Sequence, residues 1–151
     1  MRSHKGMVKK IFKGSMQIKK PISEVTEKFL DPESIRHYQD GFMKKEMRLG
    51  NVGQEDSVAM LYYKKMAIEE TVLINQLPKS YVALYHHKDR DYMIRSSFES
   101  VDENTTRFDY EYEYIRLSHR MDRWLLKLYP DFYKNNVDKW TEKFKEYVEK
   151  S

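Results

Sequence analysis

Glu70 and His87, with the phenols of Tyr92 and Tyr114, form the one grouping in this sequence that could transfer protons. A carboxylate beside an imidazole orients the ring, and histidine exchanges protons near neutral pH. These residues are far apart along the chain, so they meet only if strands of one sheet place them on the same face. A solvated rim of polar side chains explains the same residues. We therefore predict no catalytic site, and Glu70 and His87 remain candidates only for an alternative, enzymatic function.

The residue patterns of most other chemical sites are missing from the sequence. There is no cysteine, which excludes disulfides, thiolate zinc sites and cysteine nucleophiles. His86 and His87 are neighbours on a predicted strand, so they point to opposite faces and cannot bind one metal ion together. The sequence has no glycine-rich phosphate loop and no serine in a nucleophile elbow. We therefore predict neither a metal nor a cofactor.

Period-two alternation in FDYEYEYI, residues 108–115, predicts a strand with two unlike faces. One face carries acids, and the other carries the rings of Phe108, Tyr110, Tyr112 and Tyr114. A buried phenol needs a hydrogen-bond partner, and several in one row are hard to satisfy in a dry core. We therefore expect the rings to line a cavity that holds a ligand or water. Ordinary packing against the C-terminal helix is the alternative.

The preceding strand, residues 92–101, pairs with this row through a hairpin at 102–104. A three-residue loop with Asn104 in the left-handed conformation is a favoured geometry. It yields two opposite-charge pairs on the acidic face, Arg95–Glu111 and Glu99–Arg107. Such pairs contribute about 0.2–1 kcal/mol each, and they assign the acidic face to solvent. On the inner face the same register predicts the pairs Phe98–Phe108, Ser96–Tyr110, Ile94–Tyr112 and Tyr92–Tyr114.

Two more strands extend the sheet if four-residue loops lie at 88–91 and 77–80. The first loop predicts the inner-face pairs His87–Tyr92, Tyr85–Ile94 and Ala83–Ser96, and the second predicts Glu70–His87, Val72–Tyr85 and Ile74–Ala83. Ala83 and Ser96 are small and leave space beside Tyr110. The same register puts an apolar patch on the outer face, made of Leu73, Val82 and Leu84.

We predict that inner-face residues and two residues of the C-terminal helix bind a small, mostly hydrophobic molecule. The predicted ligand-binding residues are Val72, Ile74, Ala83, Tyr85, Ile94, Ser96, Phe98, Phe108, Tyr110, Tyr112, Tyr114, Trp140 and Phe144. Tyr110 and Tyr112 would supply polar anchors. The apolar walls would supply affinity through the area they bury.

The elements that must position this site follow one another in an α+β order. Residues 8–19 predict a strand, and Pro21 begins a helix that ends at Asp31-Pro32, before a second short helix. Residues 41–117 are strand-like, with turn chemistry at each break. The remainder is helical, is broken at Pro130 and ends in a long amphipathic helix. We predict an antiparallel sheet of about seven strands against that helix.

Length and composition indicate one domain. At 151 residues, with 34% charged and 40% hydrophobic residues, the chain is typical of a globular protein. The net charge is +4, and the basic residues are interspersed with acids along the chain. We therefore expect no nucleic-acid partner. Residues 1–6 are predicted to be a disordered tail before a domain over 7–151. We expect no signal peptide and no membrane insertion, and a cytoplasmic location.

The order of motifs resembles the START-like SRPBCC superfamily, in its polyketide cyclase/dehydrase-like branch and the bacterial relatives of that branch. QIKKPISEVTEKFLDPESIRHYQDG (17–41) is similar to that family's strand, proline-led helix and DPE segment. LGNVGQ (49–54) is similar to its glycine-bearing turn, and SFESVDENTTRFDYEYEY (97–114) to its strand, turn and Thr-Arg strand. Tyr38 stands where the family usually has tryptophan. The resemblance covers most of the chain and implies a helix-grip fold, a curved antiparallel sheet around a long C-terminal helix with a hydrophobic-ligand cavity between them.

The function that the resemblance implies is binding of a lipid-, isoprenoid- or polyketide-like molecule, as a carrier or sensor. One alternative is an enzyme of the cyclase or dehydratase type that uses the histidine, glutamate and tyrosines of the pocket. Another is a module that binds a protein partner. The segment RMDRWLLKLYPDFY (120–133) carries more apolar residues than one helical turn usually buries. Packing on the edge of the sheet is one interpretation, and a lid at the mouth of the cavity or a homodimer contact is the functional one.

Overall fold

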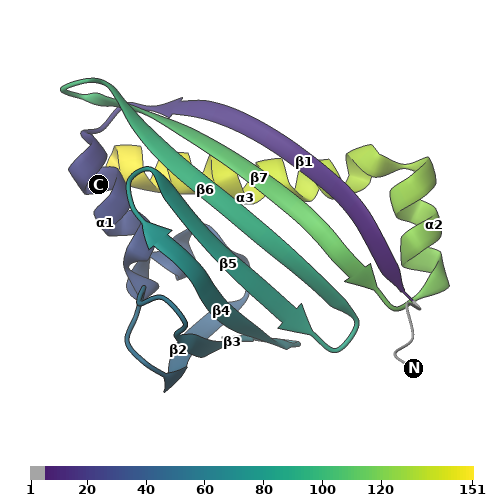
Figure 1. Cartoon of the computed structure of the whole chain (residues 1–151). Coiled ribbons are helices and arrows are strands. Elements are labelled where there is room, and N and C mark those ends of the chain that lie inside the picture. Colours follow the sequence, from purple (N-terminus) through teal and green to yellow (C-terminus); the bar gives the residue numbers. More distant parts are fainter. Residues whose placement is uncertain (1–5) are drawn as a thin grey trace.

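A seven-stranded antiparallel sheet curves around the C-terminal helix in the computed structural model, which describes residues 6–151 (Figure 1). The strands lie in the order β1-β7-β6-β5-β4-β3-β2. Their bounds are β1 Met7–Ile18, β2 Phe42–Leu49, β3 Val58–Tyr63, β4 Ala67–Gln76, β5 Ser80–His87, β6 Arg90–Asp102 and β7 Thr105–Leu117. The helices are α1 Ile22–Leu30, the 3-10 helix η1 Pro32–His37, α2 Arg120–Leu128 and α3 Pro130–Lys150. The predicted fold class, including the two short helices after the first strand, is confirmed.

The predicted tail lies almost wholly outside the described residues, because these begin at Gly6. Gly6 itself is buried, and its carbonyl oxygen accepts a hydrogen bond from the Leu117 N–H at 2.9 Å. Gly6 therefore belongs to the folded part, one residue before the predicted start. None of the helices within 6–151 combines the length and the apolar run that a membrane crossing needs.

Proline and aspartate set the helix boundaries that the sequence predicts. Asp31 separates α1 from η1, and its side chain accepts a hydrogen bond from the Glu33 N–H at 3.0 Å. Such a cap satisfies a backbone donor that has no partner within the helix. Pro130 occupies the first turn of α3, where no N–H is needed, and so divides α2 from α3.

The β6–β7 register is confirmed along its length, from Phe98 opposite Phe108 to Tyr92 opposite Tyr114. Both predicted charge pairs form on the outer face, Arg95–Glu111 at 3.5 Å and Arg107–Glu99 at 2.8 Å. The turn is different from the prediction. Asp102 pairs with Thr105 and accepts the Asn104 N–H at 2.8 Å, while a bulge at Val101 takes up the extra residue. Asn104 is not left-handed, since Asp56 is the only non-glycine residue of 6–151 with a positive φ.

The two other predicted registers are wrong by two residues, although both keep the predicted face. Tyr85 pairs with Tyr92 and Ala83 with Ile94, because the β5–β6 turn closes with two residues, Lys88 and Asp89. In the next hairpin the inner-face pairs are Glu70–Tyr85 and Val72–Ala83. A shift of two preserves the alternation of faces, whereas a shift of one would reverse it.

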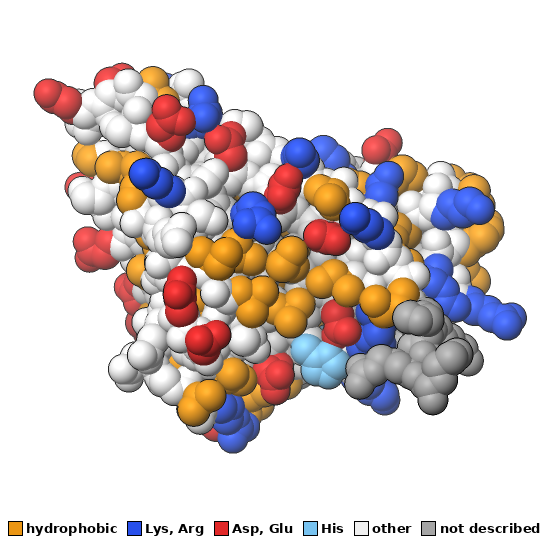
Figure 2. Space-filling view, viewed as in Figure 1, with side chains coloured by type: hydrophobic (Ala, Val, Ile, Leu, Met, Phe, Trp, Pro, Cys, Tyr) orange, Lys and Arg blue, Asp and Glu red, His pale blue; other side chains and the backbone are white. Residues whose placement is uncertain are grey.

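A bulge at Leu73 corrects the predicted outer patch. It brings Ile74 opposite Val82, so Ile74 does not face Ala83 on the inner side. Val82 is buried, Leu84 is half-buried and Leu73 is 40% exposed. Hydrophobic side chains do gather across the middle of the outer face of the sheet (Figure 2).

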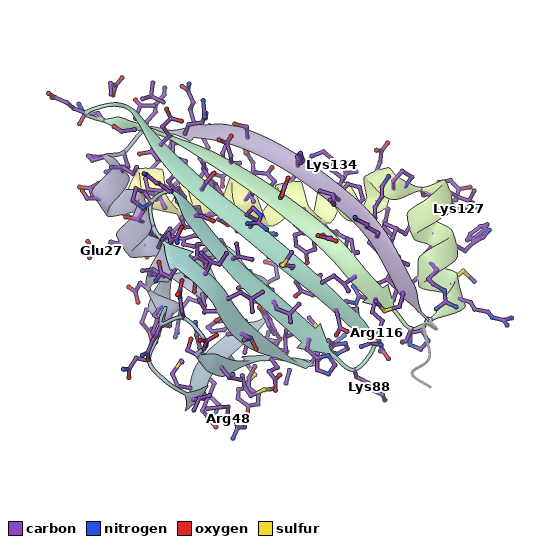
Figure 3. The ribbon with its side chains drawn as sticks, in the orientation of Figure 1. Glu27, Arg48, Lys88, Arg116, Lys127 and Lys134 are labelled. Carbon is purple, nitrogen blue, oxygen red and sulfur yellow. The ribbon has the colours of Figure 1, made fainter. Side chains whose placement is uncertain are left out.

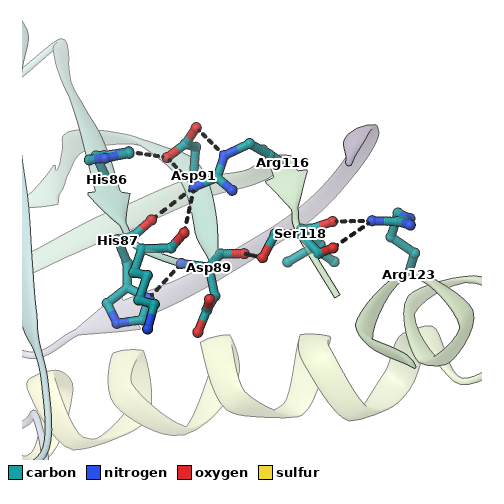
Figure 4. A network of polar contacts seen from close by, with 9 residues as sticks. His86, His87, Asp89, Asp91, Arg116, Ser118 and Arg123 are labelled. Carbon is teal, nitrogen blue, oxygen red and sulfur yellow. Dashed lines mark hydrogen bonds and ion pairs between the residues drawn. The ribbon is translucent and has the colours of Figure 1, made fainter. Parts of the chain in front are cut away.

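A network of polar contacts tightens the β5–β6 turn (Figure 4). The Arg116 guanidinium donates to the His87 carbonyl oxygen and to the Asp91 carboxylate, both at 2.9 Å. His86 contacts the same carboxylate, and the Ser118 N–H donates to the Asp89 carbonyl oxygen at 2.9 Å. Arg116 comes from β7, which pairs with β6, so a side chain outside the β5–β6 hairpin stabilises this turn.

Replacing Asp91 with asparagine should lower the free energy of unfolding by about 1.5–3 kcal/mol near neutral pH, the usual contribution of hydrogen bonds to a charged group. Burial raises the pKa of Asp91, but hydrogen bonds from Arg116 and His86 outweigh it and hold that pKa below the usual 3.8. A lowered folded-state pKa stabilises the fold above the unfolded value and loses this effect as the pH falls through the folded value. Urea unfolding should therefore separate wild type from Asp91→Asn at neutral pH and not in strong acid. Glu103→Gln, at an exposed turn position, is the matched control, and an equal loss there would contradict the assignment.

The core lies between the inner face of the sheet and the helices α1 and α3. Phe108 and Phe144 are fully buried, and the Phe29 ring of α1 packs edge-on against both. On β1, Gly14 pairs with Tyr110, and the Tyr110 ring occupies the space that a Cβ atom at position 14 would need. Glycine at position 14 therefore leaves the room that the Tyr110 ring needs.

Candidate functional site

A small chamber of about 60 Å³ lies between the inner face of the sheet and the helices. A cavity needs roughly 10–15 Å³ by this measure to hold one water, so the chamber has room for a few small groups. Its lining residues are Phe29, Leu30, Ile35, Tyr38, Gln39, Lys45, Leu61, Glu70, Tyr81, Ala83, Tyr85, Ile94, Ser96 and Trp140. Most of these are apolar or aromatic, and the others are Gln39, which follows η1, Lys45 of β2, Glu70 of β4 and Ser96 of β6.

A buried ion pair forms the polar end of the chamber. The Lys45 Nζ atom of β2 lies 2.8 Å from the Glu70 Oε1 atom of β4, and the two side chains are only 8% and 9% exposed. The Tyr85 hydroxyl of β5 donates to Glu70 Oε2 at 2.8 Å. Burial, with a further contribution from the charge of Glu70, raises the pKa of Tyr85 far above its usual value. Tyr85 is therefore a neutral hydrogen-bond donor, and Glu70 stays paired on both oxygens.

Ser96 supplies a second polar group. Its side chain is 1% exposed and lines the chamber. Its hydroxyl is the one deeply buried side-chain polar atom in residues 6–151 that makes no hydrogen bond. Buried polar groups nearly always have a partner, and a group left without one costs stability. A ligand atom or water in the chamber would supply that partner.

A larger and more open hollow of about 370 Å³, here called the vestibule, adjoins the chamber. The two share Tyr38, Gln39 and Trp140, which form a common wall. Asp40 closes one rim of the vestibule through contacts with Lys143 at 2.7 Å and Lys139 at 3.6 Å. The hydrogen bond from Lys143 is the main cause that lowers the pKa of Asp40.

The structure brings only part of the predicted ligand site to the chamber. Of the predicted ligand-binding residues, the chamber is lined by Ala83, Tyr85, Ile94, Ser96 and Trp140. All but one of the others pack in the core, namely Val72, Phe98, Phe108, Tyr110, Tyr112 and Tyr114 of the sheet and Phe144 of α3. Ile74 lies next to the Leu73 bulge and lines neither hollow.

The two predicted polar anchors have protein partners. The Tyr110 hydroxyl donates to Asp138 Oδ1 of α3 at 2.8 Å, and burial is the main cause that raises the pKa of Tyr110 to about 12. The Tyr112 ring stacks on Tyr92 with 5.0 Å between ring centroids. Neither Tyr110 nor Tyr112 lines the chamber or the vestibule.

The predicted Glu70–His87 grouping is wrong. The shift of two residues puts Tyr85, not His87, opposite Glu70. His87 lies at the end of the β5–β6 hairpin, where its Nδ1 atom accepts the Asp89 N–H at 3.2 Å. It therefore supports the turn and is no proton-transfer partner for Glu70.

Several lining residues of the chamber were not predicted from the sequence, and Lys45 is the charged one among them. It lies in MKKEMR, a charged run that suggests a solvated strand. Within β2, however, Lys45 shares its face with Met47, while Lys44, Glu46 and Arg48 share the other. A lysine on the apolar face of an alternating strand was the available signal.

Comparison with known proteins rests on structure alone, since no protein-family model and no curated protein sequence matches this chain. A hypothetical protein from Helicobacter pylori is similar with a TM-score of 0.74 at 11% identity, over 92% of this chain and 88% of that one. Ara h 8.0201 is similar with a TM-score of 0.73 at 10% identity, over 94% and 96% of the two chains.

A third similar structure is norcoclaurine synthase from Thalictrum flavum in complex with dopamine and hydroxybenzaldehyde. Its TM-score is 0.64 at 10% identity, over 95% of this chain and 88% of that one. At such low identity these likenesses establish architecture, and function has to come from the site itself. This chain has the helix-grip fold of the Bet v 1-like and START-like SRPBCC proteins.

Proposed function

We propose that this protein binds a small, mostly hydrophobic molecule between the sheet and α3, as a cytoplasmic carrier or sensor. The observation that carries the proposal is a mostly apolar chamber with one polar end, in which the Ser96 hydroxyl has no partner. The chamber alone is too small for a whole ligand, because ligand pockets usually measure about 300–1,000 Å³. The bound molecule would occupy the vestibule and extend one group past Tyr38 and Trp140 into the chamber.

The polar end of the chamber favours an uncharged hydrogen-bond acceptor on the ligand group that enters it. The charges of Lys45 and Glu70 cancel, so the pair offers little attraction to a charged ligand. A lysine ammonium has three N–H donors, and Lys45 can therefore bond Glu70 and still donate to a ligand. Ser96 can donate as well. A carbonyl or hydroxyl oxygen on an otherwise apolar lipid-, isoprenoid- or polyketide-like molecule fits this arrangement.

Native mass spectrometry of the purified protein, followed by extraction of any retained molecule, tests the proposal directly. Titration with anilinonaphthalene sulfonate gives a second readout on apolar binding. We expect Ser96→Leu, whose side chain occupies the space that the ligand group needs, to weaken binding by about tenfold or more, since forcing extra methylenes into packed space typically costs about 1–3 kcal/mol.

The matched control is Ser97→Leu, which adds the same side chain on the outer face of the same strand. Thermal melts would establish that both variants fold. Equal binding by wild type, Ser96→Leu and Ser97→Leu, or no binding by any of them, would contradict the proposal.

A second candidate function is proton transfer on a carbonyl compound, in the manner of a cyclase or dehydratase. The observation that favours it is the Glu70 carboxylate, buried at the chamber with Tyr85 and Lys45 as neighbours. Deuterium exchange into a methyl ketone, followed by NMR with wild type and Glu70→Gln, would test it. An exchange rate equal to that of buffer alone would exclude this chemistry for such substrates.

A further inference from the structure

The first turns of the C-terminal helical segment carry a cluster of exposed large apolar side chains, here called the α2–α3 patch. Its members, Met121, Trp124, Leu128, Tyr129 and Phe132, are each 50–64% exposed. Met121, Trp124 and Leu128 follow one another at intervals of three and four residues, which places them on one side of α2. The opposite side of α2 is held by Leu126, which is buried in the core.

The two halves of the patch touch. The Trp124 ring of α2 meets the Tyr129 ring edge-on, with 6.0 Å between centroids, and the Phe132 N–H donates to the Tyr129 carbonyl oxygen at 3.1 Å. The ring contact and the turn from Tyr129 to Phe132 join the two halves of the patch. Exposed apolar surfaces of this kind in a folded chain mark contact with another molecule or with a membrane.

Basic side chains flank the patch along one side of α2. Arg120 and Lys127 are exposed and form no ion pair with any residue of 6–151. Lys127 projects from the outer side of α2 (Figure 3). Arg123 donates to the carbonyl oxygens of Leu117 and Ser118, so no carboxylate neutralises it.

The nearest acid of α2 faces inward. Asp122 accepts a hydrogen bond from the Tyr133 hydroxyl and lies 3.9 Å from Arg90. The surface around the patch therefore carries a surplus of positive charge, with Asp131 as its exposed acid.

The patch adjoins the mouth of the vestibule. Phe132 precedes Asn136 by four residues on α3, and Asn136 lines the vestibule. Residues four apart lie on the same side of a helix and about 6 Å apart along its axis. The apolar surface thus begins one helical turn from the opening through which a ligand would pass.

We propose that the α2–α3 patch docks the protein on the surface of membranes that contain anionic lipids. Trp, Tyr, Leu and Phe side chains enter the boundary between headgroups and acyl chains, and flanking Lys and Arg side chains bind the lipid phosphates. A second copy of this chain is a poorer occupant. A two-fold contact places the patch against itself and so brings the basic rims of both copies together.

Vesicle flotation tests the proposal, with phosphatidylcholine vesicles that contain or lack phosphatidylglycerol. We expect wild type to float with the anionic vesicles and to stay in solution with the neutral ones. The double variant Arg120→Ala/Lys127→Ala should bind anionic vesicles about 30-fold more weakly, because each basic residue near such a surface contributes about a factor of five. Trp124→Ser/Phe132→Ser should lose about tenfold or more of the binding. Leu73→Ser, which removes an exposed apolar side chain from the outer face of the sheet, should bind as wild type does.

Two results would overturn the proposal. One is wild-type protein that stays in solution with both kinds of vesicle. The other is a wild-type dimer in sedimentation velocity that Trp124→Ser/Phe132→Ser converts to monomer, since the patch would then be a dimer contact. Docking is measured independently of the proposed ligand site, because Ser96→Leu, which blocks the chamber, should float with anionic vesicles as wild type does. Its failure and the failure of ligand binding are therefore distinguishable.

Discussion

Replacing Lys45 with methionine is expected to destabilise the protein by about 3–5 kcal/mol, the usual cost of removing one partner of a buried ion pair. The variant leaves the Glu70 carboxylate buried at the chamber without its cation. The Tyr85 hydroxyl still donates to that carboxylate, but one neutral hydrogen bond does not replace a charge partner. Urea unfolding at neutral pH, followed by circular dichroism, measures the effect.

The double variant Lys45→Met/Glu70→Gln is the control for this prediction. It removes both charges together, and replacing a buried pair by neutral residues is often close to neutral in stability. We therefore expect the double variant to recover most of what the single variant loses. A single variant within about 0.5 kcal/mol of wild type would contradict the burial of the pair, because changes of that size are typical of surface positions.

Phe108→Ala should destabilise the protein by about 3–5 kcal/mol, the range observed when a buried phenylalanine is truncated to alanine. Phe108 is fully buried, and its ring stacks on Phe98 with 4.8 Å between centroids. Phe144 and Phe29 contact the same ring edge-on, so elements from three parts of the chain would face the cavity left behind. These neighbours have little freedom to close it.

Phe132→Ala provides the matched control, since it makes the same substitution at a side chain that is 57% exposed. Its unfolding free energy should lie within about 0.5 kcal/mol of the wild-type value. If Phe108→Ala and Phe132→Ala lost equal unfolding free energy in guanidinium denaturation, Phe108 would not be the tightly packed core residue described above.

The parts of the fold that sequence predicted well are those with two independent local signals. The β6–β7 register follows from alternation in FDYEYEYI and from the charge pairs Arg95–Glu111 and Glu99–Arg107. The length of the β5–β6 turn has no such local signal. The turn is stabilised by Arg116, a residue outside the β5–β6 hairpin that donates to the His87 carbonyl oxygen.

The site was predicted less completely for a related reason. Ala83 and Ser96 could be assigned to the chamber because they are small residues on strands whose inner face was known. The alternation of β2 marks the face of Lys45, but its partner Glu70 lies two strands away in the sheet, and nothing local in the sequence indicates that pairing. Nor does alternation alone distinguish Tyr85, which faces the chamber, from Tyr110, which bonds to Asp138 of α3.

Gly14 and Tyr110 show how two positions can behave as one under mutation. The ring of Tyr110 fills the place of the side chain that Gly14 lacks, so any larger residue at position 14 displaces the ring and breaks its bond to Asp138. A larger residue at position 14 becomes tolerable only with a smaller residue at position 110. A smaller residue at position 110 alone, with Gly14 kept, leaves a groove on β1. In combinatorial libraries of this protein, we expect folded variants to carry changes at both positions together. Variants changed at only one of the two positions should be rare.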